Sequence, residues 1–344
     1  MSPERNRTRV IVGLLAILLI AGLLGSLTYV AAQSNVATEG QFEIGDGVNP
    51  LVPGLGDIDG DGLQPGPDWD DLFGANGTPK DVYDEFGALG ANGVPDFLDT
   101  FDGLRVRRDA AFLVDDISAG TAIDGSVAVG AGLVGQGTVE AIHDLGNAYA
   151  YTTFDRGNDL ILYAGLERLA PGAGSIVFEF NRKRFAVDAD GAIVGERSVG
   201  DLRVVADFPG GVLGAIQISK WEVVDAQAGA FDWSSVDTLP INAEDPAEQC
   251  NAAGTLCAVC NGSTVGGGDW TNYDSEGNVV TDLSADMFFE FGLNLSALLG
   301  VHTYDNYYGT RYANIQLTTY DDAVTPAPQD VALGSFIRAS KLAR

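Results

Sequence analysis

Two apolar runs joined by a Pro/Gly turn constrain the fold of this chain more than any other stretch. Residues 158–185 read NDLILYAGLERLAPGAGSIVFEFNRKRF, with the turn at residues 171–174. Side chains of a strand alternate between the two faces of a sheet, so the even-numbered residues from Leu160 to Leu166 share one face. The odd-numbered residues from Ile161 to Glu167 share the other. The stretch therefore predicts a β-hairpin.

Further runs of the same kind follow at short spacing. They are residues 149–154, 201–208, 215–224, 287–294, 312–320 and 331–336, and residues 295–299 read as a single helical turn. Short strands separated by turns, with almost no helical periodicity, are typical of antiparallel all-β domains. We expect eight to ten strands in a jelly-roll-like antiparallel β-sandwich with long loops and very little helix.

The N-terminal segment, residues 1–32, carries an export pattern. Arg5, Arg7 and Arg9 precede an uncharged run of residues 10–30, and small residues follow before Gln33. This arrangement indicates a cleaved signal peptide, although the run is also long enough to serve as a membrane anchor. In either case the positive flank stays in the cytoplasm. We expect a secreted protein or one on the extracellular face of the membrane, held there only by this segment if it is uncleaved.

The remaining chain divides by composition. Residues 33–56 form a polar linker, and residues 57–109 form an acidic segment rich in Gly, Pro and Asn. We place the β-sandwich at residues 110–337, with a cysteine-containing insert at residues 225–281, and a short basic tail at residues 338–344. The net charge of −29 argues against nucleic acid or an anionic membrane surface as partner.

One stretch of the acidic segment has the spacing of a calcium loop. Twelve residues from position 57 place carboxylates at positions 1, 3, 5 and 12, a glycine at position 6 and a backbone carbonyl at position 7. The predicted Ca²⁺ ligands are Asp57, Asp59, Asp61, Leu63 and Asp68. The alternative is an acidic, solvated turn without metal.

Three cysteines, Cys250, Cys257 and Cys260, lie in the predicted insert. A four-thiolate zinc site lacks a ligand, and neither histidine is nearby. The Cys257–Cys260 pair has the spacing of a redox motif but lacks the surrounding βαβ pattern. A structural disulfide is the default outside the cell.

We predict no enzymatic activity, because no nucleophile elbow or metalloprotease motif is present. Paired strand carboxylates such as Glu167 and Glu179 keep glycoside hydrolysis open as an alternative, provided that they face each other across a cleft.

Aromatic residues supply the candidate ligand-binding site. Aromatic faces stack on sugar rings or anchor protein partners at low entropic cost. The same residues could instead seal one end of the sandwich. The candidates are Trp221, Tyr304, Tyr307, Tyr308 and Tyr312.

The order of several short motifs resembles a known family. These are GNAYA at residues 146–150, DLILYAGLER at 159–168, GDLRVVADF at 200–208, GLNLSALL at 292–299 and DVALGSF at 330–336. Together they resemble the N-terminal β-rich domain of large exported bacterial cell-surface proteins, frequent in actinobacteria. The resemblance implies a disulfide between Cys250 and Cys257, leaving Cys260 free or paired to another chain.

We therefore expect a non-catalytic exported surface or extracellular protein with a structural or adhesive role. Its partners would be surface polysaccharide or other surface proteins. The alternatives are a lectin-like carbohydrate-binding module and a secreted glycoside hydrolase. Aromatic side chains on one sheet face would favour the first alternative, and two facing carboxylates in a cleft the second.

Overall fold

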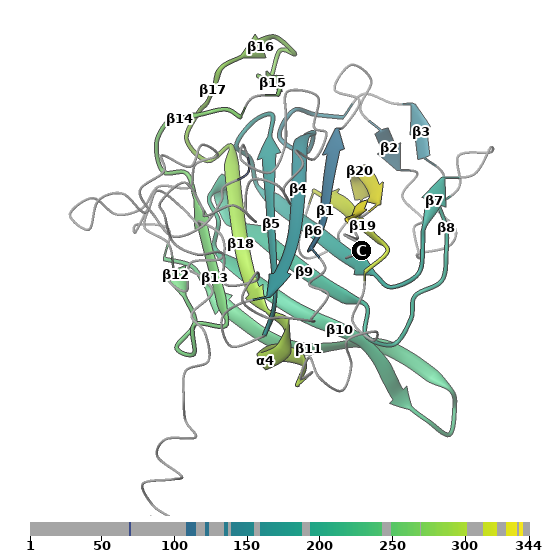
Figure 1. The fold of residues 1–344 in the computed structure, drawn as a ribbon. Helices are drawn as coiled ribbons and strands as arrows, with labels where there is room; N and C mark the ends of the chain where they lie inside the picture. Colours follow the sequence, from purple (N-terminus) through teal and green to yellow (C-terminus); the bar gives the residue numbers. More distant parts are fainter. Residues whose placement is uncertain are drawn as a thin grey trace, which may run out of the picture.

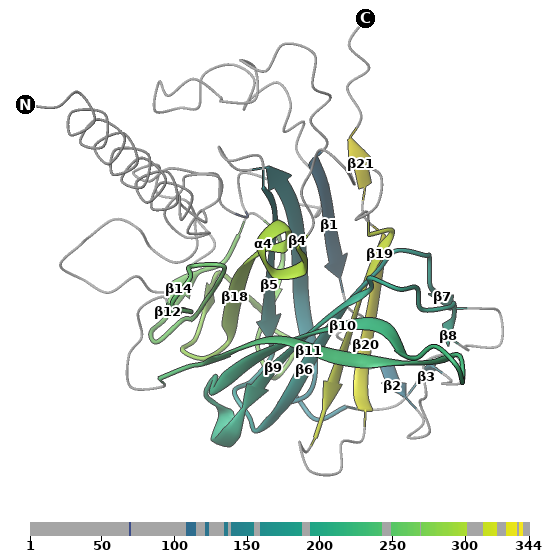
Figure 2. The ribbon, with the colours of Figure 1, turned by 90° about the horizontal axis from the view of Figure 1, so that it is seen from below.

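The structure is a computed structural model in which two antiparallel sheets face each other (Figures 1 and 2). It describes residues 69, 108–114, 121–123, 134–136, 139–154, 159–187, 193–242, 249–268, 270–300, 312–321, 328–335 and 337–339. Over these residues the all-β, antiparallel sandwich predicted from the alternating runs is confirmed.

One sheet has seven strands and the other has six. The seven-stranded sheet has the order β12 (Gln249–Cys250), β13 (Leu256–Cys260), β18 (Phe288–Asn294), β5 (Leu160–Arg168), β4 (Leu145–Phe154), β1 (Arg108–Val114) and β21 (Ile337–Ala339). The six-stranded sheet has the order β11 (Ala230–Pro240), β10 (Ala215–Asp225), β9 (Leu202–Phe208), β6 (Gly174–Asn181), β19 (Asn314–Tyr320) and β20 (Pro328–Ser335).

The remaining elements are short. Four two-stranded pairs join β2 (Thr121–Ile123) to β3 (Val134–Gln136), β7 (Ala186–Val187) to β8 (Ile193–Val194), β14 (Val265–Gly266) to β17 (Asp282–Leu283), and β15 (Asn272–Tyr273) to β16 (Val279–Val280). The 3-10 turn η1 (Pro209–Gly211) follows β9, and the predicted helical turn is α4 (Leu295–Leu299). Asn294 begins α4 by accepting a hydrogen bond from the backbone N–H of Ala297 at 2.9 Å.

The core lies between the two sheets and consists mainly of aromatic and aliphatic side chains from alternate strand positions. Phe178 of β6 packs edge-on against Phe289 and Phe291 of β18, with ring centroids 5.8 and 5.2 Å apart. All three side chains are fully buried. Because truncating such a phenylalanine costs about 3–5 kcal/mol, these contacts are a main source of cohesion between the sheets.

The predicted hairpin of residues 158–185 does not form within one sheet. Its first run is β5 of the seven-stranded sheet, and its second run is β6 of the six-stranded sheet. The Pro/Gly turn therefore carries the chain from one layer to the other. Gly172 is required in this turn, because a Cβ atom there would overlap the Ile142 side chain. The alternation is as predicted, but the strand pairing is not.

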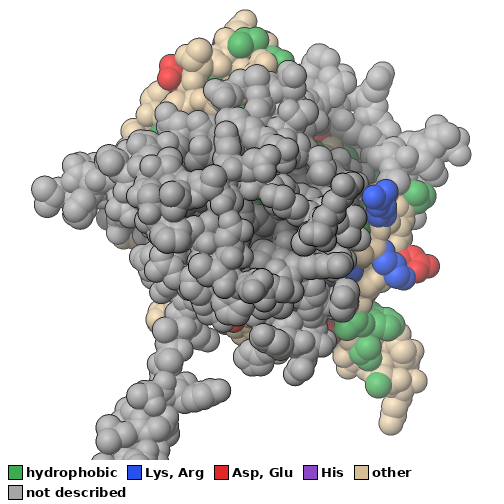
Figure 3. Space-filling model, in the orientation of Figure 1, with side chains coloured by type: hydrophobic (Ala, Val, Ile, Leu, Met, Phe, Trp, Pro, Cys, Tyr) green, Lys and Arg blue, Asp and Glu red, His purple; other side chains and the backbone are tan. Residues whose placement is uncertain are grey.

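The strand β11 was missed by the sequence analysis, which assigned it to a long insert. It pairs with β10 over the whole length of both strands, and this β10–β11 hairpin protrudes from the body (Figures 1 and 3). A bulge between Ile218 and Ser219 of β10, opposite residues 235–237 of β11, interrupts the alternation of side chains. Six of the eleven residues of β11 are also exposed and only Leu239 is buried, so the strand lacks the apolar pattern that marks a buried one.

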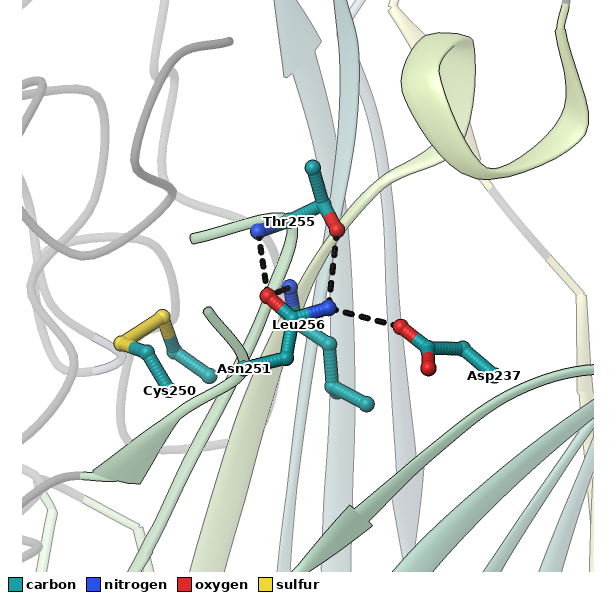
Figure 4. Close-up of a disulfide and its surroundings, with 6 residues drawn as sticks. Asp237, Cys250, Asn251, Thr255 and Leu256 are labelled. Carbon is teal, nitrogen blue, oxygen red and sulfur yellow. Dashed lines mark hydrogen bonds between the residues drawn. A yellow bond between two sulfur atoms is a disulfide. The ribbon is translucent and has the colours of Figure 1, made fainter. Parts of the chain in front are cut away.

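A disulfide joins Cys250 to Cys257, the pair that the family resemblance implies. It links directly opposed residues of β12 and β13, at the edge of the seven-stranded sheet. The adjacent Asn251 side chain accepts a hydrogen bond from the Thr255 backbone and donates one to Asp237 of β11, at 2.9 and 2.6 Å (Figure 4). The disulfide-linked turn therefore connects the edges of both sheets.

The described residues contain no helix that is long and apolar enough to cross a membrane. The predicted signal or anchor segment, residues 1–32, lies outside the described residues. The disulfide fits an extracellular location, because such bonds persist in oxidising compartments.

The third thiol should be inert in the folded protein. Cys260 is free and partly buried, and the desolvation of its thiol raises the pKa to about 12. Because the thiolate is the reactive form, iodoacetamide should label about one thiol per chain in denaturant and almost none under native conditions. Peptide mapping should recover Cys250 joined to Cys257. Rapid native labelling of Cys260, or a Cys257–Cys260 peptide, would contradict this arrangement.

Candidate functional site

An aromatic surface on the β10–β11 hairpin is the best candidate for a functional site. Trp221 of β10 and Trp233 of β11 are directly opposed in the strand register. Their ring centroids lie 5.3 Å apart at an interplanar angle of 68°. Both side chains are half-buried and lie on the face of the six-stranded sheet that points away from the core.

Phe231 extends this surface towards the tip of the hairpin. Its ring stacks on Trp221, with centroids 6.4 Å apart and an interplanar angle of 10°. The Phe231 side chain is 47% exposed, and its neighbours Val223 and Val224 are 44% and 54% exposed. Figure 3 shows hydrophobic side chains gathered on the protruding hairpin. Exposed apolar side chains that cluster in this way mark interaction sites more often than isolated ones do.

Arg197 lies over the two tryptophans and is held in place by Glu179. Its guanidinium carbon is 5.3 Å from the Trp221 ring centroid and 5.2 Å from that of Trp233. The Nε and Nη2 groups donate hydrogen bonds of 2.6–3.0 Å to the Glu179 carboxylate. A bidentate ion pair of this kind fixes the orientation of the guanidinium plane. Arg203 of the neighbouring strand β9 also contacts Trp233. We call Trp221, Phe231, Trp233, Arg197 and Arg203 the hairpin platform.

Arg203 completes the platform from the neighbouring strand β9. Its guanidinium carbon lies 4.7 Å from the Trp233 ring centroid. In the strand register, Arg203 lies directly opposite Glu179 of β6, and Glu179 lies directly opposite Gln316 of β19. Burial lowers the pKa of Arg203, while the nearby Glu179 carboxylate raises it. A row of polar side chains therefore continues from the aromatic surface across the sheet.

The side chains of this platform are of the kinds that bind a ligand by stacking and hydrogen bonding. Aromatic faces bury large area at low entropic cost and stack on flat apolar surfaces. A guanidinium held by a carboxylate is a pre-oriented hydrogen-bond donor. Together these groups suit a ligand that combines an apolar face with hydrogen-bond acceptors.

Only part of the aromatic group predicted from the sequence belongs to this platform. Tyr304, Tyr307 and Tyr308 lie outside the described residues. Tyr312 is 4% exposed and packs against Phe180 in the core between the sheets, where burial raises its pKa. The predicted grouping of Tyr312 with Trp221 is therefore wrong, because they lie on opposite faces of the six-stranded sheet. For Tyr312 the alternative, that the tyrosines seal the sandwich, is the correct one.

Trp233 and Phe231 were missed because they lie in the stretch assigned to the insert. The sequence contains one usable signal for them. Trp221 lies in the alternating run of residues 215–224, and Trp233 lies in the more polar stretch after the turn at residues 226–229, where Gly229 has a positive φ of 65°. A glycine-containing turn between two such aromatics is typical of a cross-strand pair.

The outer face of the seven-stranded sheet is different, because it is closed over a layer of buried carboxylates. Glu167 accepts hydrogen bonds from the Trp270 indole at 2.7 Å and from the Asn147 amide at 2.8 Å. Glu290 accepts one from the Trp69 indole at 2.9 Å. Both glutamates are at most 2% exposed. We call these five residues the buried carboxylate layer.

Trp69 packs closely on this face, because the residue of β5 that it contacts is Gly165, which has no side chain. A Cβ atom on Gly165 would lie 3.0 Å from the Trp69 indole nitrogen and 3.1 Å from the Tyr149 ring. The Trp69 and Tyr149 ring centroids are 5.2 Å apart. A larger residue at position 165 would displace the indole and its hydrogen bond to Glu290.

The carboxylate pair considered for hydrolysis does not come together. Glu167 lies on the outer face of the seven-stranded sheet, whereas Glu179 lies on the outer face of the six-stranded sheet and is paired with Arg197. The whole core separates them. Glu167 and Glu179 cannot act on one glycosidic bond.

The predicted calcium ligands, residues 57–68, lie outside the described residues. Within the part that the structure describes, no three His, Cys, Asp or Glu side chains form a metal-binding group.

Comparison with known proteins found no family model, no curated protein and no solved structure that matches this chain. The functional interpretation therefore rests on the geometry of the hairpin platform and on the sequence patterns.

The buried carboxylate layer should make stability fall as the pH rises from about 4.5 to about 8. Burial raises the pKa of Glu167 to about 8, and the hydrogen bonds from Trp270 and Asn147 offset only part of this shift. The unfolded chain ionises near the ordinary value of 4.5. The contribution of Glu167 to stability is therefore complete below about pH 4.5 and is lost progressively as the pH rises to about 8. The loss is on the order of 5 kcal/mol at most.

Urea unfolding followed by fluorescence between pH 5 and 9 measures this loss. Glu167→Gln should be distinctly less sensitive to pH than the wild type. Glu196→Gln, a matched change at an exposed salt bridge to Lys183, should retain the wild-type profile. Parallel profiles for the wild type and Glu167→Gln would show that Glu167 is ionised in the folded protein.

Proposed function

We propose that this chain is a non-catalytic exported protein of the bacterial cell surface, with an adhesive role carried by the hairpin platform. The observation that supports this proposal most is the cluster of partly exposed aromatic side chains on a protruding hairpin. Trp221, Trp233 and Phe231 lie together on the outer face of the six-stranded sheet, and Phe231 is nearly half exposed. A partner is a surface polysaccharide or another surface protein.

Three further observations support export and surface location. Residues 1–32 combine a basic flank, a long uncharged run and small residues, which together are typical of an export signal. The Cys250–Cys257 disulfide is of the kind retained outside the cytoplasm. The ordered motifs resemble exported bacterial surface domains.

The placement of the carboxylates favours binding over hydrolysis. Glu167 and Glu290 lie on neighbouring strands, but Trp69 and Trp270 hydrogen-bond to them and both carboxylates are buried. A substrate could reach them only if the covering indoles moved away. Glu179 is engaged by Arg197. The strand carboxylates Glu167, Glu290 and Glu179 are therefore buried or engaged, which disfavours the hydrolase alternative.

Binding through the platform predicts a specific loss in variants. Trp233→Ala should weaken adhesion to purified bacterial cell-wall material roughly 30-fold, because truncating a central aromatic anchor costs about 2 kcal/mol. Phe231→Ala, at a more exposed position, should reduce binding with less risk to the fold. Sedimentation of the wall with bound protein measures both effects.

Val279→Ala is the control, because Val279 is 69% exposed on the separate β15–β16 pair. Its binding should equal that of the wild type. If Trp233→Ala and Phe231→Ala bind as well as the wild type, the platform is not the adhesive surface.

Calcium binding to residues 57–68 forms part of the proposal. Four aspartates at the spacing of a calcium loop repel one another, and Ca²⁺ would remove this repulsion. Millimolar Ca²⁺ should raise the melting temperature, since a ligand at 100 times its Kd adds about 2.7 kcal/mol of stability. The double variant Asp57→Ala, Asp61→Ala should lose the shift. A full shift in the double variant would assign the metal to other carboxylates.

A further inference from the structure

We propose that the ligand of the hairpin platform is an uncharged polysaccharide. Phe231 and the exposed parts of Trp221 and Trp233 would contact its sugar rings, and Arg197, which lies over both indoles, would donate hydrogen bonds to its hydroxyl groups. This inference rests on the proposed adhesive function and narrows the partner to one chemical class. Three features of the platform support it: the arrangement of the aromatic rings, the state of the Arg197 guanidinium and the charge around the site.

The aromatic rings offer more than one kind of surface. Trp221 and Phe231 are nearly parallel, whereas Trp233 is turned steeply against Trp221. A ligand with flat C–H faces at several orientations, such as a chain of pyranose rings, can contact both surfaces. The polar row of Arg203, Glu179 and Gln316 extends from the platform across strands β9, β6 and β19. Glu179 and Gln316 are only 6% and 4% exposed, so a ligand would contact this row at Arg203 and on the platform itself.

Arg197 has donors that the protein itself does not use. Its Nε and Nη2 groups are bound to Glu179, and among the described residues Nη1 has no hydrogen-bond partner. The Arg197 side chain is 16% exposed, so part of it is accessible to a ligand. Two N–H groups of fixed direction beside aromatic rings match neighbouring hydroxyl oxygens on a sugar. The Gln316 side-chain oxygen, buried in the same row, is also without a partner.

The charge around the platform selects against other ligands. Glu179 neutralises Arg197, and the exposed residues Asp225 and Asp232 flank the aromatic rings. With a net charge of −29, the chain repels anionic polymers and also repels a second copy of itself. An uncharged polysaccharide meets no such repulsion. One kind of ligand could then cover the partly exposed aromatic rings and accept hydrogen bonds from the Nη1 group of Arg197.

Affinity electrophoresis of the full chain in native gels tests this inference. The gels contain neutral polymers (hydroxyethylcellulose, dextran, mannan or laminarin) or anionic ones (alginate or polygalacturonate). At least one neutral polymer should retard the protein, and no anionic polymer should. Trp221→Ala and Trp233→Ala should each raise the Kd about tenfold or more. Arg197→Lys should also weaken binding, because Lys cannot reproduce the fixed guanidinium donors. Val279→Ala should migrate like the wild type.

Pretreated cell walls separate a failure of this inference from a failure of the proposed function. Periodate cleaves the vicinal diols of polysaccharides, whereas a protease removes protein partners. Binding that is lost after periodate and retained after protease supports the inference. Platform-dependent binding that is lost after protease and retained after periodate overturns it, while the adhesive function stands. Retardation by anionic polymers alone would also overturn it. Wall binding that is unchanged in Trp221→Ala and Trp233→Ala overturns both.

Discussion

The packing of aromatic side chains between the two sheets is the interaction on which the rest of this structure depends. Phe178 of one sheet meets Phe289 and Phe291 of the other, and alternate residues of strands such as β5, β6, β9 and β18 fill this core. Alternation leaves each of these strands with a second, outward face. The two sheets differ in how far their described outer faces are covered.

The seven-stranded sheet closes its outer face, whereas part of the six-stranded sheet remains open. Trp69 and Trp270 cover the first and tie themselves to Glu290 and Glu167. Burying these carboxylates is costly, and the raised pKa of Glu167 expresses that cost. On the other sheet, Glu179 is a buried carboxylate balanced by Arg197, which rests on partly exposed aromatic rings. Tryptophan and glutamate side chains therefore close the outer face of one sheet, and on the other they belong to the partly exposed surface that we propose as the binding site.

The sequence predicted the fold class because alternation in residues 158–185 is a local property. It could not predict that Pro171–Gly174 turns between sheets, since strand pairing depends on the whole core. Trp69 and its distant partner Glu290 were not foreseen, because an indole in an acidic, loop-like stretch carries no sign of the strand it will cover. Trp221 was identified, but its partner Trp233 lies in an exposed strand with a bulge, where the apolar pattern is lost. Tyr312 was assigned to the surface because tyrosine suits both environments.

The four tryptophans test the central claim, that one outer face is closed and the other is open to a ligand. Oxidation of the folded protein by N-bromosuccinimide, mapped by mass spectrometry, measures the accessibility of each indole. The account predicts that Trp221 and Trp233, both half-buried, react first and are protected by cell-wall polysaccharide. Trp69 and Trp270, at 0% and 6% exposure, should react only on unfolding. Oxidation of Trp69 and Trp270 as fast as Trp221 and Trp233, or no protection by the wall polymer, would contradict it.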